Sequence, residues 1–342
     1  MRVLVTGHDG YLGAVLVPIL LDAGFDVTGV DTYFFEDCRF GEDDAQVPAI
    51  RKDIRDLALK DLRGVEAVIH LAALSNDPLG DINADWTYDI NHRATVHLAT
   101  LSRDAGVRRF LYFSSCSMYG AGAGDDLLTE GAPLAPITPY AVSKVRSEED
   151  LQKLADRDFS PVYLRNATAY GASPRLRADI VLNNLVGWAH TTGRIRIMSD
   201  GTPWRPLVHA ADIAGACVAF LRAPIDAVHN QAFNIGSNAE NYQVRDLAEI
   251  VRQTVPNCVV EYAGNGGPDP RNYRVDFGKL TRALPGFQMQ WNARTGARQL
   301  FEAYQRVGLV EEHFQGPRYV RMKQLKHLIE VGRLDSTLRW QT

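Results

Sequence analysis

Residues 2–13 of this chain, Arg2-Val-Leu-Val-Thr-Gly7-His-Asp-Gly10-Tyr-Leu-Gly13, give the strongest indication of its fold. The first five form an apolar run that predicts a buried strand, and residues 14–23 predict a helix after the glycine turn. Gly7 permits a tight turn, Gly10 lets the backbone approach a diphosphate, and Gly13 lets the helix pack closely. Because a helix N-terminus offers free N–H donors, this strand-turn-helix unit predicts a phosphate site.

A carboxylate at the end of the next predicted strand narrows the choice of ligand. Residues 26–31 form a second apolar stretch, which ends in Asp31, 18 residues after Gly13. A carboxylate there can accept hydrogen bonds from both hydroxyls of a ribose, and it repels a 2′-phosphate. A glycine pattern alone is weak evidence, but the whole unit is specific. We therefore expect a dinucleotide site that prefers NAD to NADP.

Three residues farther along the chain predict proton transfer. Tyr140 and Lys144 begin a predicted helix over residues 140–156, and Ser115 ends an earlier apolar run. Residues i and i+4 share one helix face, so the Lys144 ammonium would lie beside the Tyr140 phenol. A phenol keeps its proton until about pH 10 unless a fixed positive charge lowers its pKa. With Ser115 holding a substrate hydroxyl, the three can exchange a proton with an alcohol, although this spacing also occurs by chance on solvated helices.

Predicted strands and helices alternate through the first half of the chain. This alternation predicts an α/β fold, a Rossmann-type doubly wound parallel sheet, with ligands at the carboxyl ends of its strands. After Tyr170 the pattern loosens, so we expect a smaller mixed α/β substrate-binding lobe. Further strands are expected at residues 49–54, 65–73, 109–115 and 161–170, and a further helix at residues 84–105. The dinucleotide-binding domain would comprise residues 1–171 with 205–236 returning to it, and the lobe residues 172–204 and 237–342.

Composition narrows the class of protein. The chain has 342 residues, 46% of them hydrophobic, and a net charge of −4, which offers no basic field for nucleic acid. The first apolar run is too short for a signal peptide or a membrane span, so we expect a cytoplasmic protein. Four scattered cysteines predict reduced thiols and no metal site. Residues 316–340 have leucines at helical spacing and predict a helix packed on the substrate lobe rather than on a membrane.

Seven motifs, in order, resemble the extended short-chain dehydrogenase/reductases of the NAD-dependent nucleotide-sugar epimerase and dehydratase family. They are Thr6-Gly7-x-x-Gly10-x-x-Gly13, Asp31, Asp53-x-x-Asp56, His70-Leu-Ala-Ala73, Ser114-Ser115-x-x-x-Tyr119-Gly120, Tyr140-x-x-x-Lys144 and Arg165-x-x-x-x-Tyr170-Gly171. The resemblance implies that Tyr140 is the general base, Lys144 its electrostatic partner and nicotinamide-ribose ligand, and Ser115 a hydroxyl clamp. It implies that NAD is bound by Gly7, Gly10, Tyr11, Leu12, Gly13, Asp31, Asp53, Ile54, Leu71, Ala72, Ala73, Tyr140 and Lys144.

The second half of the chain resembles the family's substrate segments, in Asn183-Asn184, in Trp204-Arg205-Pro-Leu-Val-His209-x-x-Asp212 and in Asp269-Pro-Arg271. Two arginines from separate segments suit a diphosphate, because guanidinium makes paired, charge-assisted bonds to phosphate oxygens. The resemblance thus implies a nucleotide-diphosphate sugar as substrate. It also implies a homodimer that pairs through the helices at residues 84–105 and 140–156. The candidate substrate ligands are Ser75, Asn76, Asn166, Asn183, Asn184, Arg205 and Arg271.

The residues after Ser115 distinguish among the family's reactions. Sugar 4,6-dehydratases of this family follow the catalytic Ser/Thr with Asp-Glu, whereas this chain has Cys116-Ser117. We therefore expect a 4-epimerase, which needs Ser115, Tyr140, Lys144 and a retained NAD. A 4-ketoreductase is an alternative. A 3,5-type epimerase that uses Cys116 is another alternative. Cys116 is offset by one residue from the cysteine of those enzymes, and in an extended segment this offset turns the side chain to the opposite face. A buried thiol also serves more often as a small apolar core side chain than as an acid or base. A non-enzymatic NAD-sensing regulator would not need the three intact catalytic residues.

Overall fold

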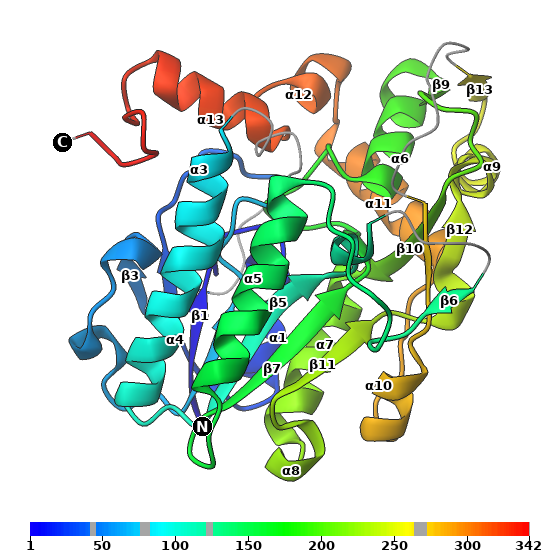
Figure 1. Cartoon of the computed structure of the whole chain (residues 1–342). Coiled ribbons are helices and arrows are strands. Elements are labelled where there is room, and N and C mark those ends of the chain that lie inside the picture. Colours follow the sequence, from blue (N-terminus) through cyan, green and yellow to red (C-terminus); the bar gives the residue numbers. More distant parts are fainter. Residues whose placement is uncertain (42–45, 76–82, 121–125, 263–271, 342) are drawn as a thin grey trace.

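The centre of the molecule is a seven-stranded parallel sheet with strand order β11-β7-β5-β4-β1-β2-β3. The computed structural model describes residues 1–341 except residues 42–45, 76–82, 121–125 and 263–271. Helices cover both faces of the sheet (Figure 1), so the predicted doubly wound α/β fold is confirmed. The strands are β1 (Arg2–Thr6), β2 (Asp26–Asp31), β3 (Ala49–Arg51), β4 (Ala67–His70), β5 (Arg109–Ser115), β7 (Ser160–Asn166) and β11 (Gln231–Ile235).

The strands are apolar on both sides because both faces of the sheet are covered. The covering helices are α1 (Gly13–Asp22) and α7 (Ala210–Arg222) on one face, and α4 (Ala94–Asp104) and α5 (Pro139–Leu154) on the other. Side chains alternate along a strand, so in β1 Val3 and Val5 pack with α1 and α7, whereas Leu4 packs with α4 and α5. The carboxyl ends of β1, β2, β4 and β5 are therefore held at one edge by two separate cores.

Four predicted elements differ in detail. The strand expected at residues 65–73 is shorter and comprises only β4, which ends at His70. The strand expected at residues 49–54 ends at Arg51, because the Asp53 carboxylate accepts from Arg55 N (2.8 Å) and caps a 3₁₀ turn, η1 (Ile54–Asp56). The strand expected at residues 161–170 is split, and its second part, β8 (Thr168–Tyr170), leaves the large sheet to pair with β10 (Trp204–His209). The helix expected at residues 84–105 comprises α3 (Ala84–Thr87), a π-helical turn, η3 (Tyr88–Arg93), and α4.

Besides the large sheet, the described residues form a three-stranded sheet, two-stranded sheets and a third apolar core. This third core forms chiefly between α6 (Val181–Thr192), α9 (Val244–Thr254) and α11 (Ala293–Val307), whose buried side chains include Leu182, Leu247 and Leu300. The remaining strands are β6 (Leu127–Leu128), β9 (Arg194–Ile197), β12 (Asn241–Gln243), β13 (Val259–Tyr262) and β14 (Arg274–Val275). The remaining helices and turns are η2 (Leu59–Leu62), η4 (Cys116–Tyr119), α6 (Val181–Thr192), α8 (Ile225–Val228), η5 (Asn238–Glu240), α9 (Val244–Thr254), α10 (Gly278–Ala283), α11 (Ala293–Val307), α12 (Glu311–Gln315) and α13 (Arg321–Glu330).

The C-terminal helix α13 packs where the sequence did not predict. Leu325 and Leu328 are buried in the same cluster as Leu4 and Ile54 of the dinucleotide-binding domain, whereas residues 316–340 were expected on the substrate lobe. In Figure 1 this segment, in red, lies along the top of the molecule above α3. Helical periodicity predicts that α13 has an apolar face, but it does not say which surface that face will cover.

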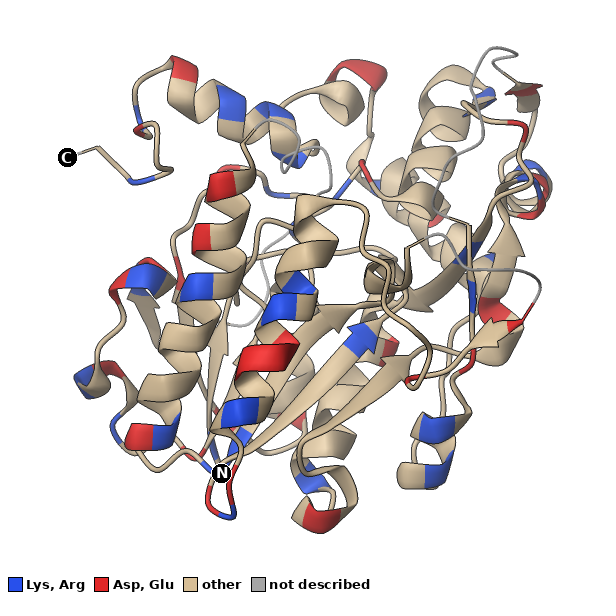
Figure 2. Ribbon diagram, viewed as in Figure 1, with Lys and Arg blue, Asp and Glu red and all other residues tan. Residues whose placement is uncertain are grey.

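Acidic and basic residues are interspersed along the ribbon (Figure 2), in agreement with the small net charge of −4. No helix in the described part of the chain is long and apolar enough to cross a membrane.

Candidate active site

The glycine turn approaches its neighbours too closely for larger residues. Gly7 has a φ of +73°, and a Cβ on it would lie 2.9 Å from Ala72 N. A Cβ on Gly13 would lie 2.2 Å from the Gly7 carbonyl oxygen. These glycines therefore leave a bare backbone cradle at the N-terminus of α1, which suits the diphosphate of a dinucleotide.

A cavity of about 850 Å³ opens at the carboxyl ends of the strands, over this cradle. The residues that were predicted from the sequence and that line it are Gly7, Gly10, Tyr11, Leu12, Gly13, Asp31, Asp53, Ile54, Leu71, Ala72, Ala73, Ser75, Ser115, Tyr140, Lys144, Asn166, Asn184 and Arg205. Residues separated by up to 198 positions in the sequence are thus brought to one cavity.

Asp31 is held by the backbone at the edge of the cradle. Its carboxylate accepts from Asp9 N (3.1 Å) and Tyr33 N (2.8 Å). Burial raises the pKa of this carboxyl, and the hydrogen bond from Tyr33 opposes the shift. Each carboxylate oxygen has a second lone pair, so Asp31 can still accept from a ribose hydroxyl. The cradle, the cavity and this acceptor together fit NAD.

Tyr140 and Lys144 lie in the first turns of α5. The Thr138 hydroxyl accepts from Ala141 N (3.2 Å) and caps this helix, which starts with Pro139. Lys144 Nζ donates to the Phe113 carbonyl oxygen (2.6 Å) and lies 5.6 Å from the centre of the Tyr140 ring. Burial lowers the pKa of Lys144 to about 7. The hydrogen bond to β5 therefore fixes a titratable ammonium next to the phenol.

Ser115 and Cys116 have different surroundings although they are adjacent. Ser115 borders the cavity, and its hydroxyl accepts from Ser117 N (3.1 Å) at the start of η4. Cys116 does not border the cavity. Its Sγ donates to the Arg165 carbonyl oxygen (3.1 Å) within the apolar core on the α1 and α7 face of the sheet. Burial raises the pKa of this thiol well above its usual range. A deprotonated Cys116 facing the cavity is therefore disfavoured by both its placement and its surroundings.

The predicted substrate ligands divide into three groups. Ser75, Asn166 and Arg205 border the cavity, and so does Asn184, whose amide donates to the Ala178 carbonyl oxygen (2.8 Å). Asn183 is fully buried behind the cavity, where its amide accepts from Gly171 N (3.0 Å) and donates to the Arg177 carbonyl oxygen (3.0 Å). Asn76 and Arg271 lie outside the described residues.

His209 and Asp212, at the end of the segment around Arg205, have structural contacts. The Asp212 carboxylate accepts from Gln290 N (2.9 Å) and Trp291 N (3.0 Å). The His209 ring stacks on Trp291 with 4.1 Å between ring centres. Both side chains thus tie the start of α7 to the strand-free segment before α11.

Two buried arginines of the cavity were missed from the sequence. Arg177 forms a two-point ion pair with Asp179 (Nε–Oδ1 and Nη2–Oδ2, both 2.9 Å), and its Nη1 donates to Ser75 Oγ (3.0 Å). Arg321 enters the cavity from α13. The run Arg175-Leu-Arg177-Ala-Asp179, which begins four residues after Gly171, was a sequence signal for Arg177. The second had no local signal.

Residues 3–236 match the model of the "NAD dependent epimerase/dehydratase family". The UDP-glucose 4-epimerase of Mycolicibacterium smegmatis is 32% identical over 295 residues, which are 83% of this chain and 89% of that protein. The dTDP-D-glucose 4,6-dehydratase of Mus musculus is 27% identical over 268 residues, 74% of each chain. Among solved structures, MoeE5 in complex with UDP-glucuronic acid and NAD matches with a TM-score of 0.78 and 28% identity, over 90% of this chain and 99% of that one.

Proposed function

Because the chain belongs to the NAD-dependent epimerase/dehydratase family, we propose that it is a nucleotide-sugar epimerase that inverts C4 through a transient 4-keto intermediate and retains its NAD. Ser115, Tyr140 and Lys144 border the same cavity as the glycine cradle and Asp31, which supports hydride and proton transfer at one sugar carbon. The proposal takes its substrate class from the relatives, of which one is named as a UDP-glucose 4-epimerase and another as a UDP-glucuronate 4-epimerase.

The state of the carboxylates favours epimerisation over dehydration. Among the described residues that line the cavity, the carboxylates are Asp31, Asp53 and Asp179. Asp31 accepts from the backbone, Asp53 pairs with Arg55 (2.7 Å), and Asp179 pairs with Arg177. Removal of water from a sugar needs a proton donor and an acceptor beside the leaving group. Since Ser115 is followed by Cys116 and Ser117, this acid and base are missing from the segment that supplies them in dehydratases of the family.

The side chains can then divide the chemistry as follows. NAD held by the glycine turn and Asp31 would supply the hydride acceptor and donor for C4, and inversion requires the keto sugar to turn in the cavity between the two transfers. Tyr140 removes the proton from the 4-hydroxyl and gives it back, while Ser115 holds that hydroxyl. The Lys144 ammonium stabilises the phenolate that forms on Tyr140. Arg205, with Arg271, would hold the diphosphate of the substrate.

A homodimer through α4 and α5 is part of the same proposal. The two helices pack against each other on one face of the sheet. Light scattering on the purified protein tests this: a mass twice that of the 37.9 kDa chain supports the dimer, and a mass of one chain contradicts it.

The test of the function is made on protein purified without added cofactor. The protein is first denatured and any released nucleotide identified. Fresh protein is then incubated with UDP-, dTDP-, GDP- and CDP-sugars, with Tyr140→Phe as the matched inactive control, and the products are separated chromatographically. Released NAD and a product of equal mass, formed without a net change in NADH, support the epimerase. Turnover only with added NAD(P)H would indicate a ketoreductase, and loss of water a dehydratase; either result contradicts the proposal.

A further inference from the structure

Arg321, the first residue of α13, is a buried cation at the wall of the cavity. Only 5% of its surface is exposed, and it lines the cavity together with Asp31 and Phe35. Its guanidinium carbon lies 3.9 Å from the centre of the Phe35 ring, and Nη2 donates to the Arg175 carbonyl oxygen (3.0 Å). Nη1 has no hydrogen-bond partner in the described part of the chain.

No carboxylate of the described residues forms an ion pair with this guanidinium. Two neighbouring buried arginines are paired, Arg177 with Asp179 and Arg175 with Asp9 (2.5 Å). Burial, and next the charge of Arg177, lower the pKa of Arg321 to about 10, so it remains a cation at neutral pH. A buried charge without a counter-ion is costly, and an anionic ligand would remove that cost.

The neighbours of Arg321 place it on the side of the cavity that takes the ADP half of a dinucleotide. Phe35 follows Asp31, the predicted ribose ligand, by four residues. Arg175, which accepts the Nη2 hydrogen bond through its carbonyl, pairs with Asp9 inside the glycine turn. The guanidinium thus lies between the loop after β2 and a segment fastened to the diphosphate cradle. A diphosphate of the nucleotide sugar is the other possible source of the same anionic group.

We propose that Arg321 is a ligand of the dinucleotide and binds the diphosphate of its ADP half, opposite the backbone N–H groups of the glycine turn. Guanidinium suits this role because it makes charge-assisted bonds to phosphate oxygens. The inference rests on NAD binding and is independent of the proposed epimerisation. With this role for Arg321, helix α13 forms one wall of the cofactor site.

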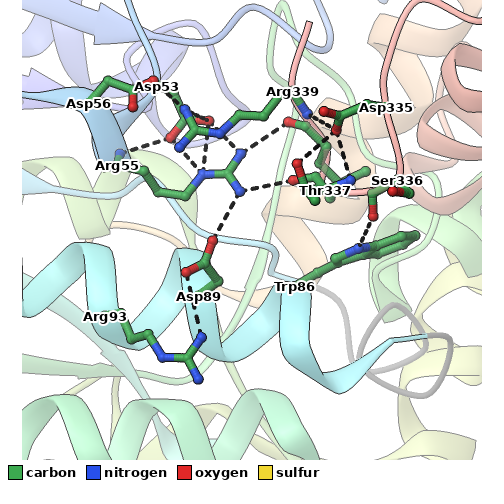
Figure 3. Close-up of polar contacts among 11 residues, drawn as sticks. Asp53, Arg55, Asp56, Trp86, Asp89, Arg93, Asp335, Ser336, Thr337 and Arg339 are labelled. Carbon is green, nitrogen blue, oxygen red and sulfur yellow. Dashed lines mark hydrogen bonds and ion pairs between the residues drawn. The ribbon is translucent and has the colours of Figure 1, made fainter.

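The segment after α13 holds this wall in place. We call residues 333–341 the C-terminal strap. Arg55 donates to the carbonyl oxygens of Thr337 (2.8 Å) and Leu338 (3.1 Å), and Arg339 forms an ion pair with Asp56 (Figure 3). These contacts anchor the strap next to Asp53 and Ile54, the predicted adenine neighbours. Arg321 is therefore fixed before the ligand arrives, which lowers the entropic cost of binding.

Binding to cofactor-free full-length protein, measured by titration calorimetry, tests the role of Arg321. The ligands are NAD, ADP-ribose, which keeps the diphosphate but lacks nicotinamide, and UDP, which reports on the substrate side. For Arg321→Gln we expect Kd to rise about ten- to a hundredfold for NAD and for ADP-ribose, with UDP unchanged. Lys326→Gln, on the exposed face of the same helix, is the matched control and should change none of the three.

A second variant and a second measurement guard against misfolding. Arg321→Lys keeps the charge and should recover part of the affinity for ADP-ribose. Without ligand, Arg321→Gln should melt no lower than the native protein, because it removes an unpaired buried charge, whereas the rise in Tm on adding NAD should shrink. Equal Kd values of Arg321→Gln and native protein for NAD and ADP-ribose would overturn the proposal. So would a loss confined to UDP, which would assign Arg321 to the substrate.

Discussion

The indole N–H of Trp340 donates to the carbonyl oxygen of Thr32 at 2.6 Å, which joins the C-terminal strap to the loop directly after Asp31. The same ring packs on Phe34, with 5.8 Å between ring centres. The strap therefore closes over the loop that positions the predicted ribose ligand, although 308 residues separate the two partners in sequence.

Trp340→Ala should open the strap without unfolding the protein. Because the substitution removes both the hydrogen bond and the ring contact, local opening becomes less costly. Hydrogen exchange followed by mass spectrometry should show faster exchange for peptides covering residues 334–341 and unchanged exchange for β1. Val331→Ala, at an exposed position just before the strap, is the control. Trp86 also contacts the strap, since its indole N–H donates to the Ser336 carbonyl oxygen (2.7 Å). Unchanged exchange in Trp340→Ala would mean that Arg55 and Trp86 hold the strap without the Trp340 ring.

Tyr140→Phe should abolish turnover and leave NAD binding nearly intact. The substitution removes only the phenol hydroxyl, so proton transfer is lost while the ring stays beside Lys144. A general base contributes about a 10²- to 10⁴-fold rate increase, which sets the expected fall in kcat. Kd for NAD and kcat on a nucleotide sugar are the measurements, with the exposed Tyr262→Phe as control. Retained turnover would remove Tyr140 from the mechanism.

Lys144 should make the cofactor-free protein more stable as the pH rises. Its pKa is lowered by burial from 10.5 to about 7, so between these values the unfolded chain binds the extra proton. Stability rises with pH wherever the unfolded state binds more protons. The native protein should therefore gain stability in this window, and Lys144→Met should lose that part of the pH dependence. Urea denaturation across the window measures it; parallel curves for the two proteins would contradict a lowered pKa.

Local sequence patterns were sufficient to bring the predicted dinucleotide ligands to one cavity. The glycine turn, Asp31 and the Tyr140–Lys144 pair each depend on neighbours within a few residues or on one strand-turn-helix unit. The strands β1, β2 and β5 begin and end where the apolar runs predict. Such patterns indicate both the type of secondary structure and which of its faces is buried, so the predicted residues could be placed at one cavity.

The parts that were missed depend on long-range contacts. β8 leaves the main sheet because it pairs with β10, a partner about 40 residues away in the chain. Arg321 reaches the cavity because α13 packs on the other domain, and the strap holds Arg55 from more than 280 residues away. Neither periodicity nor a motif specifies which of two apolar surfaces a terminal helix will cover. The position of α13 and the burial of Arg321 could therefore not be predicted from the sequence.

Arg165→Met should strongly destabilise the protein. Arg165 forms a buried ion pair with Glu148 (2.6 Å), with 7% and 2% of the two side chains exposed. Loss of the arginine leaves a buried carboxylate without a partner, which costs about 3–5 kcal/mol of unfolding free energy. Equilibrium denaturation measures this, and the double variant with Glu148→Leu should recover part of the loss. Arg252→Met, which breaks an exposed pair with Glu249, should leave the midpoint unchanged; a similar effect of both single variants would contradict the argument.

Cys116→Ala separates the 4-epimerase from a 3,5-type epimerase that uses this thiol. Cys116 is 1% exposed, its Sγ faces the Arg165 carbonyl oxygen, and burial raises the pKa of the thiol. The variant should therefore keep its turnover and lose about 1 kcal/mol of stability through a small cavity. Cys217→Ala, fully buried in the same apolar cluster, is the matched control and should behave alike in both measurements. A fall in kcat for Cys116→Ala alone, with equal stability losses, would mean that the thiol reaches the substrate during turnover and that proton exchange next to the ketone is part of the reaction.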